Sequence, residues 1–323
     1  MNDTQMRTWA EISLKNIEHN YKAIRARLGE GTRFLGVVKA DAYGHGAVQV
    51  AGLLQELGCD YLGVACLNEA LQLRESGIRL PILIMGYTPP EFTPMLMEYN
   101  LTQTVYDLEL AEAFSSAAAA LGKILKIHLK ADSGMGRLGF KCHGGRDPER
   151  DMTRITKLPG LHIEGIFTHF AVSDVSGDPF SEKQFNDYKA LVDRLEKNAG
   201  VKFEIKHCAN SGAMINYAWS YFDMVRPGLS LYGLYPGRDT GDLDLRPVME
   251  LKTRIAQIKE YEPGDTVSYG RIFTVPQKMR LAVITIGYAD GLFRTLSGNI
   301  DVLVRGRRAR QVGRICMDMC MID

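Results

Sequence analysis

A lysine stands where a buried strand is expected to end. Residues 34–38 form an apolar run, and Lys39 follows it directly, ahead of Tyr43, Gly44 and Gly46. An amine held among packed strands loses hydration, which lowers its pKa and increases the neutral, nucleophilic fraction. That neutral form makes Schiff bases with carbonyl groups. A lysine at a strand end that merely extends to solvent would show the same short pattern. The neighbouring residues are therefore needed to distinguish a reactive lysine from an exposed one.

Other residues able to bind or react also follow apolar runs. Together with Lys39, these strand-end candidates are Met85, Arg137, His169, Asn210, Ser211, Arg226, Gly228 and Leu229. The triplet 210–212 opens a helical segment and would by itself be a helix cap. Beside Gly228 and opposite Tyr43, however, its hydroxyl and backbone N–H groups would suit a phosphate.

The elements that position these residues alternate between short apolar strands and helical segments. The expected strands are 34–38, 61–65, 82–85, 102–106, 125–129, 162–168, 203–207 and 222–225. Helical periodicity marks residues 47–57, 67–76, 108–121 and 182–198 between them. Eight strands with intervening helices predict an α/β fold, a parallel (β/α)8 barrel. All the candidates then lie at the C-terminal mouth, where barrel enzymes carry their active sites.

The composition changes after Gly237. Residues 238–244 are polar and turn-rich, and they predict a linker. The alternation that follows predicts β-strands at 249–258, 267–269, 279–286, 300–304, 309–312 and 315–322. We therefore expect a barrel domain, residues 1–237, followed by a smaller and mostly β C-terminal domain, residues 238–323.

Composition limits the class of protein. The 323 residues carry a formal net charge of +1 and lack the basic excess of a nucleic-acid-binding surface. The sequence shows no signal-peptide core and no apolar run of about 18 residues. Its six cysteines follow no disulfide or zinc spacing. These features predict a cytoplasmic protein with neither a membrane segment nor a metal site.

The segment 37–46, VVKADAYGHG, resembles the pyridoxal 5'-phosphate (PLP) attachment segment of alanine racemases. Later motifs extend this resemblance over nearly the whole chain. The family implies that PLP is bound covalently to Lys39. It places phosphate contacts at positions that match Tyr43, Ser211, Gly228 and Leu229. Met85, His169 and Asn210 are expected to contribute to the same cofactor site.

The resemblance also implies that Arg226 faces the pyridine nitrogen of PLP. A guanidinium group stays protonated and cannot accept a proton from that nitrogen. An unprotonated ring is a weaker electron sink, so a substrate carbanion regains its proton at Cα. This arrangement favours racemisation over transamination.

Racemisation requires a proton carrier on each face of a planar carbon. Lys39 can serve one face, and Tyr269 matches the tyrosine that the family supplies from the partner subunit. A phenol has a reference pKa of about 10 and needs help to act near neutrality. The family's hydrogen-bonded chain, which here runs from Tyr269 through His169 to Arg226, would provide that help. We therefore expect a homodimer with shared active sites.

The remaining site residues concern the substrate. Arg137 suits an amino-acid carboxylate, which a guanidinium binds through two hydrogen bonds. Lys130 matches a position that is carbamylated in some family members. Met317 matches a backbone contact from the partner chain, and Tyr288 is expected to line the same entrance. The side chains expected around the substrate would leave a small space that admits a methyl group. Such a pocket discriminates poorly against one added hydroxyl, so serine is expected as a minor substrate.

The family's second domain continues for several tens of residues beyond the position that matches Asp323. A tyrosine near the phosphate lies in that part, so the β domain is expected to be incomplete. The predicted function is PLP-dependent interconversion of L-alanine and D-alanine, which supplies D-alanine for peptidoglycan. The alternatives are a serine or broad-specificity racemase, a barrel-type amino-acid decarboxylase, which Arg226 disfavours, and a PLP-binding module without catalysis.

Overall fold

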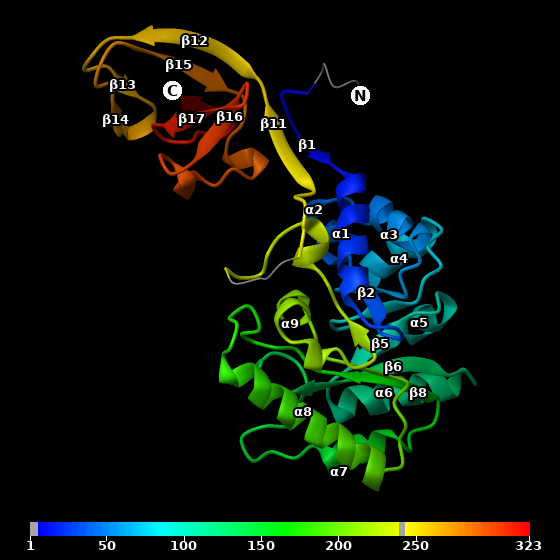
Figure 1. Cartoon of the computed structure of the whole chain (residues 1–323). Helices are drawn as coiled ribbons and strands as arrows, with labels where there is room; N and C mark the ends of the chain where they lie inside the picture. Colours follow the sequence, from blue (N-terminus) through cyan, green and yellow to red (C-terminus); the bar gives the residue numbers. More distant parts are fainter. Residues whose placement is uncertain (1–5, 239–242) are drawn as a thin grey trace. The chain divides into compact units, whose positions relative to one another are not determined.

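The computed structural model describes residues 6–238 and 243–323, and the chain forms two compact units (Figure 1). One unit is Ser13–Val248, and the other is Met249–Asp323 together with the N-terminal segment that ends at Ile12. Residues 239–242 of the expected linker lie outside the described residues. In the described part of the chain, no helix is long and apolar enough to cross a membrane.

The first unit is built on eight parallel strands that neighbour one another in the order β10-β2-β3-β4-β5-β6-β8-β9. Their bounds are β2 (Arg33–Val37), β3 (Tyr61–Val64), β4 (Ile82–Ile84), β5 (Thr102–Val105), β6 (Leu125–Asp132), β8 (Leu161–Phe167), β9 (Ile205–His207) and β10 (Met224–Val225). Asp223 N–H donates to Lys206 O at 3.0 Å and Arg226 N–H donates to Ala209 O at 2.9 Å, which brings the ends of the sheet together. The prediction of a (β/α)8 barrel is confirmed.

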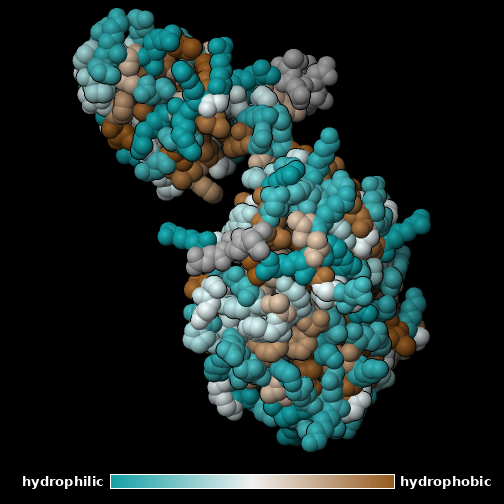
Figure 2. Space-filling view, in the orientation of Figure 1, coloured by the Kyte–Doolittle hydropathy of each residue, from teal (hydrophilic) through white to brown (hydrophobic). Residues whose placement is uncertain are grey.

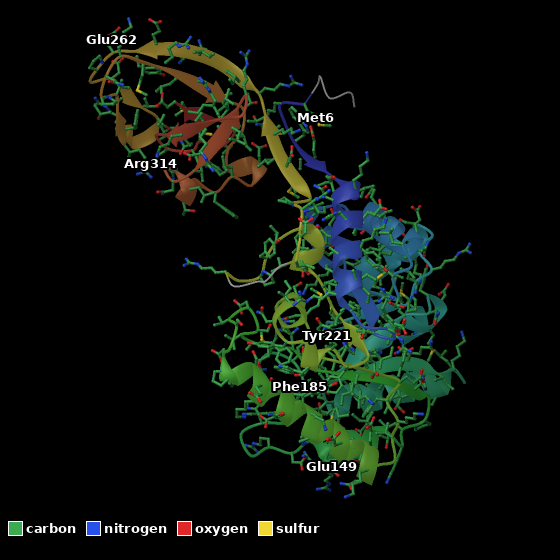
Figure 3. All side chains as sticks on the ribbon, in the orientation of Figure 1. Met6, Glu149, Phe185, Tyr221, Glu262 and Arg314 are labelled. Carbon is green, nitrogen blue, oxygen red and sulfur yellow. The ribbon has the colours of Figure 1, made fainter. Side chains whose placement is uncertain are left out.

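Helices surround these strands. They are α1 (Leu14–Arg27), α2 (Lys39–Gly44), α3 (Ala47–Glu56), α4 (Leu67–Glu75), α5 (Thr93–Glu98), α6 (Leu108–Ala120), α7 (Glu149–Ile155), α8 (Pro179–Asn198) and α9 (Ser211–Asn216). Side-chain N-caps start the longest ones, since Ser13, Asp107 and Asp178 each accept a backbone N–H of the first turn. Phe185, labelled on α8 in Figure 3, packs against Trp219 and Phe222.

The barrel interior is filled rather than hollow. Leu35, Val37, Tyr61, Leu83, Ile205 and Met224 form an apolar cluster contributed by five of its strands. Such a packed interior holds the strand ends rigidly, so the side chains at the C-terminal mouth keep fixed relative positions. A short strand β7 (Phe140–Lys141) pairs with the end of β6 and anchors the loop that carries Arg137.

The second unit is a β domain. Strand β1 (Thr8–Ile12) pairs with β11 (Met249–Thr253), and a five-stranded sheet has the order β12-β15-β18-β17-β16. The bounds in that sheet are β12 (Ile255–Tyr261), β15 (Met279–Ile284), β16 (Asp301–Val304), β17 (Arg307–Val312) and β18 (Cys320–Ile322). A hairpin of β13 (Thr266–Val267) and β14 (Phe273–Thr274) completes the strands of this unit among the described residues.

Three sequence predictions for this unit differ from the structure. The single strand expected at 249–258 is two strands that break at Arg254, and only Cys320–Ile322 of the expected 315–322 is a strand. Tyr269, expected to end a strand, lies in the 3-10 turn Tyr269–Arg271. Positive φ angles of 69° at Ser268 and 51° at Arg271 turn the chain out of the strand at this point.

Candidate active site

A cavity of about 490 Å³ opens at the C-terminal ends of the barrel strands. Of the predicted site residues, it brings together Lys39, Tyr43, Met85, Lys130, Arg137, His169, Asn210, Ser211, Arg226, Gly228 and Leu229. Phe167, Ser173 and Asp174 also line it, although the sequence analysis did not select them. Tyr269, Tyr288 and Met317 belong to the β domain.

Lys39 enters the cavity from an unusual turn. The next four residues, Ala40 to Tyr43, all have left-handed backbone angles, with φ between 51° and 57°. Burial lowers the pKa of the Lys39 amine, and the cations Arg137 and Arg226 lower it further, whereas the carboxylate of Glu69 raises it. A useful neutral fraction of this amine therefore exists closer to physiological pH than for an exposed lysine.

One corner of the cavity is formed by α9 and the segment after β10. Asn210 caps α9 by accepting the Ala213 N–H, and Ser211 Oγ accepts the Gly228 N–H at 2.9 Å. At Gly228, an added Cβ would lie 2.7 Å from the hydroxyl oxygen of Tyr43. The absence of a side chain at this glycine leaves room for the Tyr43 hydroxyl in the same corner as the Ser211 hydroxyl. Hydroxyl groups beside exposed backbone suit an anion.

Arg226 is buried, with 3% of its surface exposed, and its guanidinium is held on several sides. Nη1 donates to His207 Nδ1 at 3.0 Å, while Nη2 donates to the carbonyl oxygens of Thr168 and Cys208 at 2.9 and 3.1 Å. Nη2 also lies 3.2 Å from Nδ1 of His169. Burial lowers the pKa of Arg226 to about 10, so the group remains a cation at neutral pH.

The polar contacts of Arg226 continue through the barrel interior. Because arginine only donates, His207 Nδ1 must carry the lone pair, and His207 Nε2–H then donates to His128 Nδ1 at 2.9 Å. His128 Nε2–H in turn donates to Glu164 at 3.0 Å, and the Tyr61 hydroxyl donates to the same oxygen at 2.6 Å. Arginine at one end and a carboxylate at the other therefore fix both histidine tautomers.

This buried chain of hydrogen bonds was not predicted from the sequence. His128 lies within β6, Glu164 within β8 and His207 at the end of β9, all in runs that were selected as strands for their apolar neighbours. Polar residues inside otherwise apolar barrel strands were the available signal, since such groups are buried only with partners.

His169 and Lys130 complete the charge balance of the cavity. Burial lowers the pKa of His169 well below its ordinary value, and Arg226 and Arg137 act in the same direction, so the ring is neutral. Burial together with Arg137 and Arg226 lowers the pKa of Lys130 to about 8. Asp174 is the one carboxylate among the described lining residues, so the cavity favours anionic ligands.

The predicted residues of the β domain lie on exposed turns. Tyr269 is 66% exposed, and Met317 is 58% exposed. Tyr288 N–H donates to Cys316 O at 3.0 Å and Ala289 N–H donates to Met317 O at 2.8 Å, so the turns that carry Tyr288 and Met317 are joined. Hydrophobic residues appear among the polar ones on the visible face of this unit (Figure 2).

The barrel therefore carries, at its C-terminal mouth, a cavity whose charged lining groups are mostly cations, among them the partly buried amine of Lys39. Residues 12–236 match the family model "Alanine racemase, N-terminal domain", and residues 248–323 match "Alanine racemase, C-terminal domain". The chain belongs to the alanine racemase family, as the resemblance of its motifs indicated.

Individual relatives agree with this assignment. An alanine racemase of Desulforamulus reducens is 45% identical over 98% of this chain and 85% of its own length. Alanine racemase 2 of Caldanaerobacter subterraneus subsp. tengcongensis is 46% identical, over 98% of this chain and 81% of its own. The predicted enzyme class, an alanine racemase isomerase, is confirmed.

Solved structures give the same result. The alanine racemase of Clostridium difficile 630 matches with a TM-score of 0.91 and 42% identity, covering 98% of this chain and 83% of that one. The alanine racemase of Bacillus anthracis, solved with bound L-Ala-P, matches with a TM-score of 0.89 and 35% identity, covering 98% of this chain and 81% of that one.

Proposed function

We propose that this chain interconverts L-alanine and D-alanine with PLP as cofactor, and that Lys39 is both the attachment point of the cofactor and one of two bases. The observation that carries the proposal is that Lys39 and Arg226 line one cavity whose other charged groups are mostly cations. A cofactor phosphate and a substrate carboxylate both need such an environment.

The residues present fit PLP. A cavity of about 490 Å³ is within the range of small-molecule sites. The Ser211 hydroxyl, the Tyr43 hydroxyl and the backbone at Gly228 and Leu229 would hold the phosphate, with Asn210 fixing the start of α9 and Met85 contributing an apolar side to the cavity. When bound, PLP draws electrons from the Cα–H bond of an amino acid and makes that proton removable.

Arg226 would fix the reaction type. Its guanidinium remains protonated, because even the lowered pKa of about 10 lies well above neutrality. It can therefore donate a hydrogen bond to a ring nitrogen but cannot take a proton from it. This disfavours transamination, and it also disfavours a barrel-type decarboxylase, which would place a carboxylate at this point.

The second base is proposed to be Tyr269 of a partner subunit. His169 is neutral, and its Nδ1 faces Arg226, so its Nε2–H remains to donate toward the cavity. A phenolate oxygen beside that N–H, and near the positive charge of Arg226, would be stabilised. Tyr269 is exposed on its own chain, and a homodimer with shared sites gives it a function there. Tyr288 and Met317 would accompany it.

Arg137 would bind the substrate carboxylate, and Lys130 would orient Arg137. The pKa of about 8 leaves a neutral fraction of the Lys130 amine at pH 7 that can attack carbon dioxide. The new N–C bond forms with loss of one proton to water, and the product is an anionic carbamate. That group would accept hydrogen bonds from Arg137 and hold the guanidinium in one orientation.

Incubation with L-alanine and PLP in deuterated water tests the proposal. Two proton carriers on opposite faces should place deuterium at Cα of both enantiomers and bring the mixture toward equal amounts of each. Release of carbon dioxide would identify a decarboxylase, and binding of alanine without exchange would identify a non-catalytic module. A parallel incubation with L-serine measures how strongly the site prefers a methyl group. Cytoplasmic location and a role in peptidoglycan supply stay predictions.

A further inference from the structure

The backbone that follows Lys39 is strained. Ala40, Asp41, Ala42 and Tyr43 have φ angles of 52°, 51°, 54° and 57°, and none of them is glycine. The left-handed conformation is unfavourable for residues with such side chains, because Cβ comes too close to the backbone. Four such residues in succession are therefore rare. Contacts from the surrounding structure must hold this turn in place.

Glu69 of α4 holds the end of the turn beside Lys39. One oxygen of its carboxylate, Oε1, accepts the Ala40 N–H at 2.7 Å. The other oxygen, Oε2, accepts the Ala65 N–H, also at 2.7 Å. Ala65 directly follows β3, the barrel strand next to the one that leads into Lys39. One side chain therefore fixes the first strained residue to the end of the neighbouring strand.

Different contacts hold the far end of the turn. Asp41 Oδ1 accepts the Ala47 N–H at 2.7 Å, and His45 Nδ1 lies 3.0 Å from the carbonyl oxygens of Ala42 and Tyr43. The His45 ring also stacks on Tyr232, with ring centres 4.5 Å apart. Without the Glu69 contacts, the end of the turn near Tyr43 would therefore stay in place. The peptide that joins Lys39 to Ala40 would lose its support.

The charge of Glu69 matters as well as its reach. Burial, Arg137 and Arg226 lower the pKa of Lys39, and Lys130 adds another nearby cation to the same cavity. Glu69 acts in the opposite direction on the pKa of Lys39. The carboxylate thus keeps the ammonium form of Lys39 accessible, which a base that must take up and return a proton requires.

We propose that Glu69 is a positioning residue for racemisation, which directs Lys39 into the cavity by clamping the left-handed turn and balances the charge of its ammonium. This rests on the proposed function, in which Lys39 is the cofactor lysine and a base. In this role Glu69 acts through the Ala40 and Ala65 N–H groups, and it is not among the described residues that line the cavity.

Three variants distinguish the effect of the negative charge of Glu69 from the effect of its side-chain length. Glu69→Gln keeps the length of the side chain but loses its charge and one acceptor. Glu69→Asp keeps the charge but is one methylene too short to reach both N–H groups. Glu75→Gln removes an exposed carboxylate from the same helix and serves as the matched control. Thermal unfolding of the wild type and of the three variants reports whether each variant folds.

Trace acetylation measures the protonation of Lys39 directly. The full chain is freed of PLP with hydroxylamine and labelled over a pH series, and the Lys39 peptide is quantified by mass spectrometry against the peptide of the exposed Lys15. We expect the labelling midpoint of Lys39 to shift to lower pH in Glu69→Gln and to stay close to wild type in Glu69→Asp and Glu75→Gln. An unchanged midpoint in Glu69→Gln would overturn the charge role.

Kinetics of the PLP-loaded enzyme measure the positioning role. We expect kcat for alanine to fall on the order of tenfold to a hundredfold in both Glu69 variants, with a smaller change in KM because Arg137 is untouched. A loss of thermal stability with unchanged kcat would mean a purely structural clamp and contradict the proposal. Borohydride reduction of the wild type must place the cofactor on Lys39. If it marks another lysine, the proposed function fails, independently of Glu69.

Discussion

At the scale of single residues, the site combines side chains whose ordinary chemistry the barrel has altered. Lys39 and Lys130 are amines made less basic by burial among cations, whereas Arg226 loses basicity but not its charge. Glu164 differs, because hydrogen-bond donors keep it ionised where burial alone would protonate it. The surroundings of each group therefore determine its pKa, and this can be tested one residue at a time.

Lys130 is expected to carry a carbamate. Its amine must lose a proton before it attacks carbon dioxide, so carbamate content should increase as the pH rises through about 8. With carbon-13-labelled bicarbonate, NMR of the wild type should show one carbamate carbon that is absent from Lys130→Met. The same signal in both proteins, or no signal at any pH, would contradict the assignment. The variant should also raise KM for alanine, because Arg137 loses its orienting partner.

Glu164 is expected to make the free energy of unfolding depend on pH in the acid range. Burial opposes its ionisation, but hydrogen bonds from His128 and Tyr61 lower its pKa from 4.5 to about 2. A carboxylate whose pKa is lower in the folded state than in the unfolded state stabilises the fold at a pH above its unfolded-state pKa. That contribution is lost as the pH falls toward the folded-state pKa. It should thus be present at pH 7 and lost between about pH 4.5 and 2.

Urea unfolding of Glu164→Gln at several pH values measures this contribution. The glutamine retains an acceptor for His128 but does not titrate, so the free energy of unfolding of the wild type should fall relative to the variant on acidification. The expected difference is on the order of 2–3 kcal/mol between neutral and strongly acid pH. Glu182→Gln, an exposed change on α8, should follow the wild type. If the free energies of unfolding of the wild type and Glu164→Gln changed equally with pH, the proposed role of Glu164 in the buried chain of hydrogen bonds would be contradicted.

At the scale of elements, the cofactor corner depends on the close approach of two loops. A Cβ at Gly228 would lie 2.7 Å from the Tyr43 hydroxyl oxygen, and the Tyr43 ring already packs against Tyr232. Gly228→Ala should therefore displace Tyr43 and lower the affinity for PLP by about tenfold or more, as overpacking of 1–3 kcal/mol implies. Absorbance titration of the cofactor-free protein measures this.

A helix glycine provides the control for that change. A Cβ at Gly52, in α3, would have no atom within 4 Å, so Gly52→Ala should leave PLP affinity unchanged. Equal affinities in the wild type and Gly228→Ala would remove Gly228 from the proposed phosphate contacts.

Most of the barrel was predictable from the sequence, and the reasons are local. Short apolar runs bounded by turn residues located the eight strands, and the strand order of a closed barrel placed Lys39, Arg137, His169 and Arg226 at one mouth. The four left-handed residues after Lys39 carry no such signal, because Ala and Tyr at positive φ are held there by distant partners such as Glu69. Tyr269 was assigned to a strand for the same reason, since its turn depends on a positive φ at Ser268.

At the scale of the whole molecule, the proposed reaction needs two chains. Lys39 lies in the barrel unit and Tyr269 in the β domain. In the proposed dimer, the two bases of one site come from different subunits. A two-fold homodimer would then contain two equivalent sites, each built from one barrel and the partner's β domain. This arrangement predicts that defects in the two bases complement each other.

Mixed dimers of two inactive variants test this arrangement. In a dimer of one Lys39→Ala chain and one Tyr269→Phe chain, one site carries both substitutions and the other carries neither. Each variant alone should be nearly inactive as a racemase in both directions, because either direction removes a proton from one face of Cα and returns one to the other face. Random exchange of subunits should restore about a quarter of wild-type activity in both directions, since half of the dimers are mixed and each has one intact site. If both bases came from one chain, every site would keep a defect and mixing would restore nothing, so the same measurement decides whether the active site is shared.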